Sequence, residues 1–180
     1  MQETIQTTPK FAFKTKPDIP TDFSGGGLMY NNILVPIDNS KCSELAVKQA
    51  FDISRLLGSQ VTLLHVMDNT PSPEALEAGQ ALLEHLALGA RFKPKLQITQ
   101  TSDQSVANRI LEVAHELNID LIVLGTHGRQ GIERLKLGSV AQAVAGSSDI
   151  PVQIIPMRVR ASHDFASRWK EATSPTSNPE

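Results

Sequence analysis

Short apolar runs alternate along the middle of the chain with longer segments in which apolar residues recur every three or four positions. The runs at 32–38 and 61–68 are almost continuously apolar, which is typical of strands buried on both faces of a sheet. Further strands are predicted at 120–125 and 152–156. Residues 95–101 alternate apolar and polar side chains, which favours a strand nearer a sheet edge.

Helical periodicity fills the intervals between these strands, over 41–58, 74–88 and 105–118, and a fourth helix is predicted to start at 138. Ser40 is placed to cap the first helix and Gly58 to end it. The apolar face of the first helix is predicted to comprise Leu45, Ala46, Ala50, Ile53 and Leu57, and that of the third helix Ile110, Val113, Ala114 and Leu117.

This strict alternation of strands and helices predicts an α/β fold with a doubly wound, five-stranded parallel sheet and helices on both faces. Crossover connections in such sheets are right-handed, and the very apolar first strand suits a central position. The chain of 180 residues is long enough for one domain with a full core and short for two.

The two ends of the chain depart from this pattern. Residues 1–29 are rich in Thr, Pro and Lys and end near three consecutive glycines, so we expect a flexible arm with a hinge. Residues 158–180 are expected to form a tail that is mostly disordered. The domain itself is therefore predicted to span 30–157.

Charge and composition narrow the function classes. Lys and Arg total 17 against 19 Asp and Glu, and aromatic residues make up 4%, so we expect no nucleic-acid surface. Cys42 is the only cysteine, which excludes a disulfide framework and a cysteine-based metal site. The sequence shows no signal-like or membrane-length apolar run, so we expect a cytoplasmic protein without membrane association.

The segment 125–139, GTHGRQGIERLKLGS, carries the strongest signal of chemistry. It joins a buried strand to a helix, and in such sheets ligands bind beyond the carboxyl ends of the strands. The helix start at Gly138 and Ser139 offers N–H groups and the positive end of a dipole to a phosphate. The motifs GxxxxGK[ST] and, after the first strand, GxGxxG are absent. The glycines alone leave two interpretations open, a phosphate cradle or a tight turn with a close helix entry.

Written with its gaps, this segment is Gly125-x2-Gly128-x9-Gly138-Ser139. The pattern resembles the ATP-binding signature of the universal stress protein family, G-x2-G-x9-G-[ST]. The stretches ILVPIDNS, VTLLHVMD, DLIVLGTHG and DIPVQIIP resemble strands of the same family, so the resemblance covers 30–157. It implies an adenine nucleotide alpha hydrolase-like fold with the strand order 3-2-1-4-5.

The resemblance also implies a nucleotide site. Asp38 matches the acidic residue that contacts the ribose or adenine, Pro36 would shape the floor beside it, and Val66 matches the position whose backbone meets the adenine. Ala141 stands where some members carry a hydroxyl residue, so one phosphate contact would be missing here. The ribose and phosphate side would be lined by Leu124, Gly125, His127 and Gly128, and the phosphates would be held at the helix start by Gly138, Ser139, Val140 and Ala141.

Several residues near this site allow a simpler interpretation. Asp38 can cap the turn into the first helix instead of contacting a ligand. His127 can act as an acid or base, or it can pack against a ribose or face solvent. Arg129, Arg134 and Lys136 can reach phosphate oxygens or remain solvated. Metal-ligand spacings such as HExxH are absent, so Mg²⁺ is expected only as a companion of ATP.

The expected function is that of an ATP-binding regulatory or protective factor in the stress response, with ATP, ADP or AMP as the occupant. One alternative is a slow ATP hydrolase, although Asp38 and His127 are the only catalytic candidates and we assign neither a catalytic role. Another alternative is a nucleotide-free module that binds a protein partner. The apolar last strand, 152–156, would lie at a sheet edge, and the family pairs this strand across a twofold axis, so a homodimer is expected.

Overall fold

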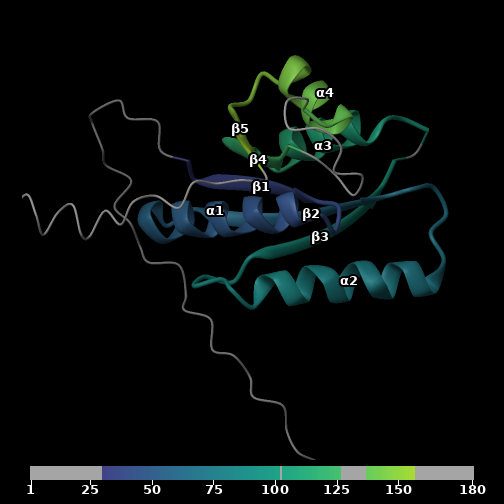
Figure 1. The fold of residues 1–180 in the computed structure, drawn as a ribbon, viewed down its shortest axis with the longest axis horizontal. Coiled ribbons are helices and arrows are strands. Elements are labelled where there is room, and N and C mark those ends of the chain that lie inside the picture. Colours follow the sequence, from purple (N-terminus) through teal and green to yellow (C-terminus); the bar gives the residue numbers. More distant parts are fainter. Residues whose placement is uncertain (1–29, 102, 127–136, 157–180) are drawn as a thin grey trace, which may run out of the picture.

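The computed structural model describes residues 30–101, 103–126 and 137–156. Parallel strands form one sheet in the order β3-β2-β1-β4-β5, which confirms the predicted doubly wound fold and its strand order (Figure 1). The predicted arm at 1–29 and tail at 158–180 lie outside the described residues. The strands are β1 (Asn32–Ile37), β2 (Gln60–Met67), β3 (Lys95–Gln100), β4 (Leu121–Gly125) and β5 (Val152–Ile155).

In the described part of the chain, helices cover both faces of the sheet (Figure 1). α1 (Lys41–Leu57) and α2 (Pro73–Ala87) lie on one face, and α3 (Val106–Glu116) and α4 (Ser139–Ser147) lie on the other. The helices begin and end close to their predicted bounds. None of the helices in the described ranges is both long and apolar enough to cross a membrane.

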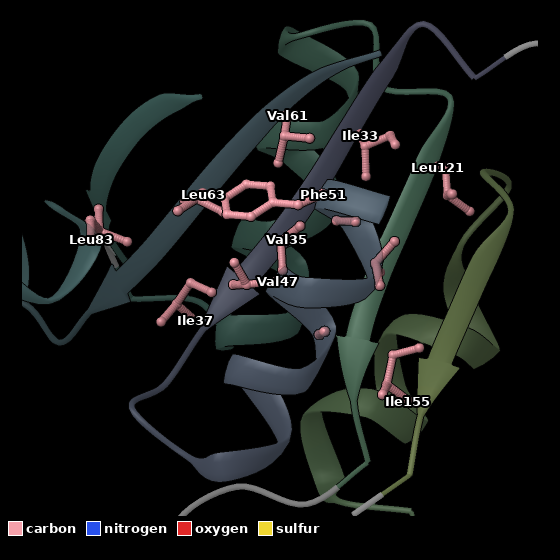
Figure 2. Close-up of a cluster of buried hydrophobic side chains, with 13 residues drawn as sticks. Ile33, Val35, Ile37, Val47, Phe51, Val61, Leu63, Leu83, Leu121 and Ile155 are labelled. Carbon is pink, nitrogen blue, oxygen red and sulfur yellow. The ribbon is translucent and has the colours of Figure 1, made fainter. Parts of the chain in front are cut away.

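The face under α1 and α2 buries one apolar cluster (Figure 2). Ile33 and Val35 of β1 point to this face because successive side chains of a strand alternate between the two sides of the sheet. Phe51 of α1 and Leu83 of α2 pack against the same cluster. Burying a side chain of this size stabilises a fold by roughly 1.5–3 kcal/mol, so this contact holds both helices on the sheet.

The buried stripe of α1 differs from the predicted one. Ala46 and Ala50 are buried as predicted, whereas Leu45, Ile53 and Leu57 are only half-buried at the rim. Ser43 and Ser54 are also deeply buried in this stripe. Both hydroxyls form hydrogen bonds to nearby carbonyls, so these serines cost little to bury. These hydroxyls donate from Ser43 to the Ser40 carbonyl at 2.9 Å and from Ser54 to the Ser59 carbonyl at 2.7 Å.

The opposite face carries a second apolar cluster beneath α3 and α4. Leu34 of β1 and Ile122 of β4 belong to it, on the side of the sheet opposite to Ile33 and Val35. The predicted face of α3 is confirmed, since Ile110, Val113 and Ala114 are buried and Leu117 packs beside them half-buried.

Three of the described helices begin at a serine that caps them. In each case the serine hydroxyl accepts the backbone N–H of the residue three positions later. The predicted cap at Ser40 is confirmed, and Gly58 ends α1 in the left-handed conformation, with φ 70°. α4 differs from these helices, because its cap residue is Gly138 and no side chain forms a capping hydrogen bond. The serine caps are Ser40 for α1, Ser72 for α2 and Ser105 for α3.

Gly125, the last residue of β4, packs directly against Cys42 near the start of α1. A Cβ atom placed on Gly125 would lie 2.6 Å from the Cβ of Cys42 and 2.7 Å from its carbonyl carbon. Such distances are too short for carbon atoms in contact, and Cys42 is completely buried, so its backbone has no room to move away. Glycine is therefore required here by packing, independently of any ligand.

We predict that Gly125→Ala destabilises the protein by about 1–3 kcal/mol through overpacking against Cys42. The matched control is Gly146→Ala, because a Cβ on Gly146 in α4 would meet no atom within 4 Å. That control should be neutral or stabilising by up to about 1 kcal/mol, since alanine favours helix. Urea unfolding followed by circular dichroism measures both, and equal effects of the two substitutions would contradict the packing argument.

Candidate functional site

A cavity of about 630 Å³ opens at the carboxyl ends of β1, β2 and β4, beside the start of α4. The strand order reverses between β1 and β4, which is the place where open α/β sheets generally bind ligands. Two of the predicted site residues, His127 and Gly128, lie outside the described residues. The others all line this cavity: Pro36, Asp38, Val66, Leu124, Gly125, Gly138, Ser139, Val140 and Ala141.

The first turn of α4 forms one wall of the cavity. The first hydrogen bond within this helix runs from the N–H of Gln142 to the carbonyl of Gly138, at 2.8 Å. The N–H groups of Ser139, Val140 and Ala141 precede it, so they have no acceptor inside the helix. All three residues line the cavity. This turn can therefore present N–H donors and a positive helix end to an anion.

α2 also begins beside the cavity, but its own residues satisfy its N-terminus. Ser72 accepts the N–H of Ala75 at 3.2 Å. Glu74 lies in the first turn, and hydrogen bonds from its own backbone N–H and from Ser72 lower the pKa of its carboxyl. A carboxylate thus already stands at this helix end. α4 has no acidic residue in its first turn, so an anionic ligand is favoured at α4 over α2.

Two backbone hydrogen bonds fix Thr126 and Gly138, the described residues near the two ends of the segment 127–136. The N–H of Thr126 donates to the carbonyl of Ile155 at 3.0 Å, which ties the end of β4 to the end of β5. The N–H of Gly138 donates to the carbonyl of Thr126. The start of α4 is therefore attached to the sheet through Thr126, which fixes the helix end relative to the strand ends.

Asp38 follows β1 and supports the turn into α1. Its Oδ1 accepts the backbone N–H of Ser40 at 3.1 Å, and Asn39 between them has a φ of 62°. The side chain is exposed and also lines the cavity. Its turn-supporting role is therefore compatible with the predicted contact to a ligand hydroxyl or base, and that contact stays a prediction.

The wall of the cavity that follows β2 was not predicted from the sequence. Asp68, Asn69, Thr70 and Pro71 line the cavity in the connection from β2 to α2. Asn69 donates through Nδ2 to the Oδ1 of Asp103 at 2.9 Å, which ties this connection to the one between β3 and α3. Their position directly after a strand was the available signal, since residues there lie at the ligand-binding edge of a parallel sheet.

His65 was also missed as a lining residue. Its Nδ1 lies 2.8 Å from the carbonyl oxygen of Ile37, and because a carbonyl only accepts, Nδ1 carries the proton. The ring packs under α2, where a Cβ on Gly79 would come within 3.0 Å of it. His65 therefore joins β2 to the last residue of β1, directly before Asp38.

Charged side chains are few in the described lining, which includes Asp38 and Asp68 but no Lys or Arg. Within that part of the wall, a phosphate would depend on backbone N–H groups and hydroxyls. The candidate cations Arg129, Arg134 and Lys136 lie outside the described residues. Within the described ranges, no group of three His, Cys, Asp or Glu side chains is placed to hold a metal ion.

Comparison with known proteins identifies the family. The model of the universal stress protein family matches residues 29–156. The chain belongs to the universal stress protein family. Universal stress protein MJ0531 of Methanocaldococcus jannaschii is 31% identical to it over 144 residues, which are 72% of this chain and 84% of that protein.

Solved structures of universal stress proteins share the fold. The structure of MJ0577 from Methanocaldococcus jannaschii matches with a TM-score of 0.65 and 26% identity, over 73% of this chain and 99% of that one. The universal stress protein from Archaeoglobus fulgidus in complex with dAMP matches with a TM-score of 0.58 and 22% identity, over 71% and 98%. A universal stress protein in complex with cAMP gives 0.59 and 22%, over 72% and 99%.

We predict that Asp38→Ala destabilises this universal stress protein by about 1 kcal/mol, because the N–H of Ser40 loses its carboxylate acceptor. Asp38→Asn should cost less, since its amide oxygen can still accept that hydrogen bond. Chemical unfolding of both variants measures the difference. If Ala and Asn destabilise equally, the hydrogen bond to Ser40 does not support the turn.

Proposed function

We propose that this universal stress protein binds an adenine nucleotide, ATP, ADP or AMP, in the cavity at the carboxyl ends of β1, β2 and β4. The observation that carries the proposal is the first turn of α4. Its N–H groups have no acceptor within the helix, its cap is a glycine, and it faces a cavity of about 630 Å³. A phosphate satisfies these N–H groups and the helix dipole together.

Adenine nucleotides are the ligand class because of the family and its solved members. The structural neighbours include one protein in complex with dAMP and one in complex with cAMP, and both share this fold. The lining supports the same class, since apolar side chains of β2 and α3 line part of the cavity. These side chains include Val66, Met67, Val106 and Ile110, which suit the flat apolar faces of a purine.

Each wall of the cavity supplies part of the proposed contacts. N–H groups of Ser139, Val140 and Ala141 would bind the phosphates, with the Ser139 hydroxyl as a further donor. Asp38 would accept from the ribose hydroxyls or the base, and Pro36 and Val66 would border the adenine. Leu124, Gly125, His127, Gly128 and Gly138 complete the proposed set. Mg²⁺ would arrive with ATP, bound to phosphate oxygens.

We further propose that the output is regulatory or protective in the stress response, through a surface that changes when nucleotide binds, rather than through rapid catalysis. His65, the histidine in the described wall, already uses Nδ1 to hold the Ile37 carbonyl. We assign no catalytic role to a residue of the described wall, and we expect any hydrolysis of ATP to be slow. Phosphate release that stays near the uncatalysed rate supports a regulatory role, and fast turnover with many cycles would favour the hydrolase instead.

The nucleotide proposal is tested by thermal unfolding in the presence of ATP, ADP, AMP and cAMP. A ligand that binds only the folded state stabilises it by RT ln(1+[L]/Kd), about 2.7 kcal/mol at a hundredfold excess over Kd. We expect a rise in Tm with at least one of these nucleotides, and a smaller rise with pyrophosphate, which lacks adenosine, at the same concentration. No rise with any nucleotide would favour the nucleotide-free module.

We predict that Ser139→Asp raises the stability of α4 and lowers the affinity for nucleotide. A carboxylate in the first turn of α4 stabilises the helix by about 0.3–1 kcal/mol. The same charge repels a phosphate about 4 Å away by about 4 kcal/mol at a protein surface, so nucleotide affinity should fall at least about tenfold.

The matched control is Gln142→Glu, which adds the same charge one turn later, at an exposed position that does not line the cavity. Calorimetric titration with ATP should show near-normal affinity for this variant. Equal affinity loss in the two variants, or none in Ser139→Asp, would contradict phosphate binding at α4.

We also propose that the protein forms a homodimer through β5. The carbonyls of Pro151 and Ile155 accept N–H groups of β4, and backbone groups alternate sides along a strand. The N–H and carbonyl groups of Val152 and Ile154 therefore face the open edge of the sheet, where a second copy can pair with them.

Light scattering should give twice the chain mass of 19.6 kDa at micromolar concentration. Ile154→Pro removes one outward N–H without removing a bond to β4, so it should give a monomer with unchanged far-ultraviolet circular dichroism. A monomeric wild-type protein would contradict the proposed dimer.

A further inference from the structure

An apolar groove of about 440 Å³ lies at the amino ends of the strands, the end of the sheet opposite to the nucleotide cavity. The last turns of α1 form one side of it, and the first residues of β4 and β5 form the other. The side chains that matter below are Tyr30, Ile53, Leu56, Leu57, Leu121 and Pro151.

The groove has the character of a contact surface. No charged side chain lines it within the described residues. Leu56 is 84% exposed, which makes it the most exposed large apolar side chain in the described part of the chain. Ile53, Leu57 and Tyr30 beside it are half-buried. Contiguous exposed apolar side chains of this kind commonly mark a surface that another segment covers.

The chain itself leads into this groove. Tyr30 lines it and is the first described residue, so the segment 1–29 starts from the groove. That segment holds three of the six phenylalanines of the chain, which gives it apolar anchors despite its polar composition. In KFAFKTK, Phe11 and Phe13 alternate with Ala12 and Lys14. An extended backbone would place both rings on one side.

We propose that the N-terminal segment of the same chain covers this groove, with Phe11 and Phe13 as its anchors. An apolar cavity of about 150 Å³ holds one benzene ring. The groove, at about 440 Å³, therefore has room for two phenyl rings. Covering Leu56 and burying the two rings removes apolar surface from water on both partners, which is the driving force for docking.

The tether favours this occupant over a freely diffusing partner. The residues between Phe13 and Tyr30 number 16, and a flexible linker of that length has an end-to-end distance of roughly 22 Å. Such a linker gives an effective concentration on the order of millimolar, far above that of a freely diffusing protein at micromolar concentration. The three glycines at 25–27 allow the chain to reverse direction shortly before Tyr30.

Disulfide trapping tests the proposal on the full chain. Leu56→Cys combined with Phe13→Cys should form an intrachain disulfide under mild oxidation, detected by mass spectrometry of peptides. The matched control is the same cysteine pair with Phe11→Ser added, which removes one proposed anchor and leaves the length of the tether unchanged. Cys42 is completely buried and should not compete. We expect the pair with Phe11 intact to close about tenfold faster than the control, which corresponds to about 1.4 kcal/mol of docking.

Two outcomes overturn the proposal. Equal closure rates with and without Phe11→Ser would show that the N-terminal segment has no preference for the groove. A disulfide that links two chains would show that a second copy supplies the occupant.

A second readout avoids any change to the groove. Phe11→Ser with Phe13→Ser should raise deuterium uptake in peptides that cover 53–58 and 150–153, because the end of α1 and the start of β5 lose their cover. Uptake over β2 should not change, and Phe165→Ser should leave all these peptides unaffected. Unchanged uptake at 53–58 in the double variant would contradict docking, whatever the protein does with nucleotides.

Discussion

All five strands of the sheet run in the same direction, and the rest of the structure depends on this constraint. It gathers every connection from a strand to the following helix at one edge, so residues far apart in the sequence become neighbours there. Asp38, Val66 and Ser139 line one cavity for this reason. The same constraint gathers the ends of helices and the starts of strands at the opposite edge, where Tyr30, Leu56 and Pro151 form the apolar groove.

At the first edge, the backbone N–H groups of the helix N-termini are satisfied in different ways. This difference determines which end of the cavity favours a phosphate. Serine hydroxyls cap α1, α2 and α3, and Glu74 adds a carboxylate at α2. α4 begins at Gly138 with neither a side-chain cap nor an acidic residue in its first turn. Backbone N–H groups left without an acceptor carry a free-energy cost unless water or a ligand satisfies them. A bound phosphate would remove that cost, so ligand binding and the stability of α4 should be linked.

The fold could be predicted from the sequence because the signals are local. Continuous apolar strands, serine caps and Gly58 each act within a few residues of the chain. The buried face of α1 was predicted only in part, because Ser43 and Ser54 satisfy their hydroxyls with nearby carbonyls and hydropathy does not register this. The packing of Gly125 on Cys42, and the hydrogen bond from His65 to Ile37, depend on contacts between distant segments. Such contacts leave no periodic pattern in a single sequence. The spacing of the glycines in the segment 125–139, in contrast, can be seen in the sequence.

The central claim is that backbone N–H groups at the start of α4 bind the phosphates of an adenine nucleotide. Two-dimensional amide NMR during a titration with ATP tests it most directly, because each N–H reports its own environment. We predict that the amides of Ser139, Val140 and Ala141 shift the most among the described residues, with smaller shifts at Asp38 and Val66 around the adenine and ribose. Saturable shifts that leave the first turn of α4 unaffected, or the absence of any saturable shift, would contradict it.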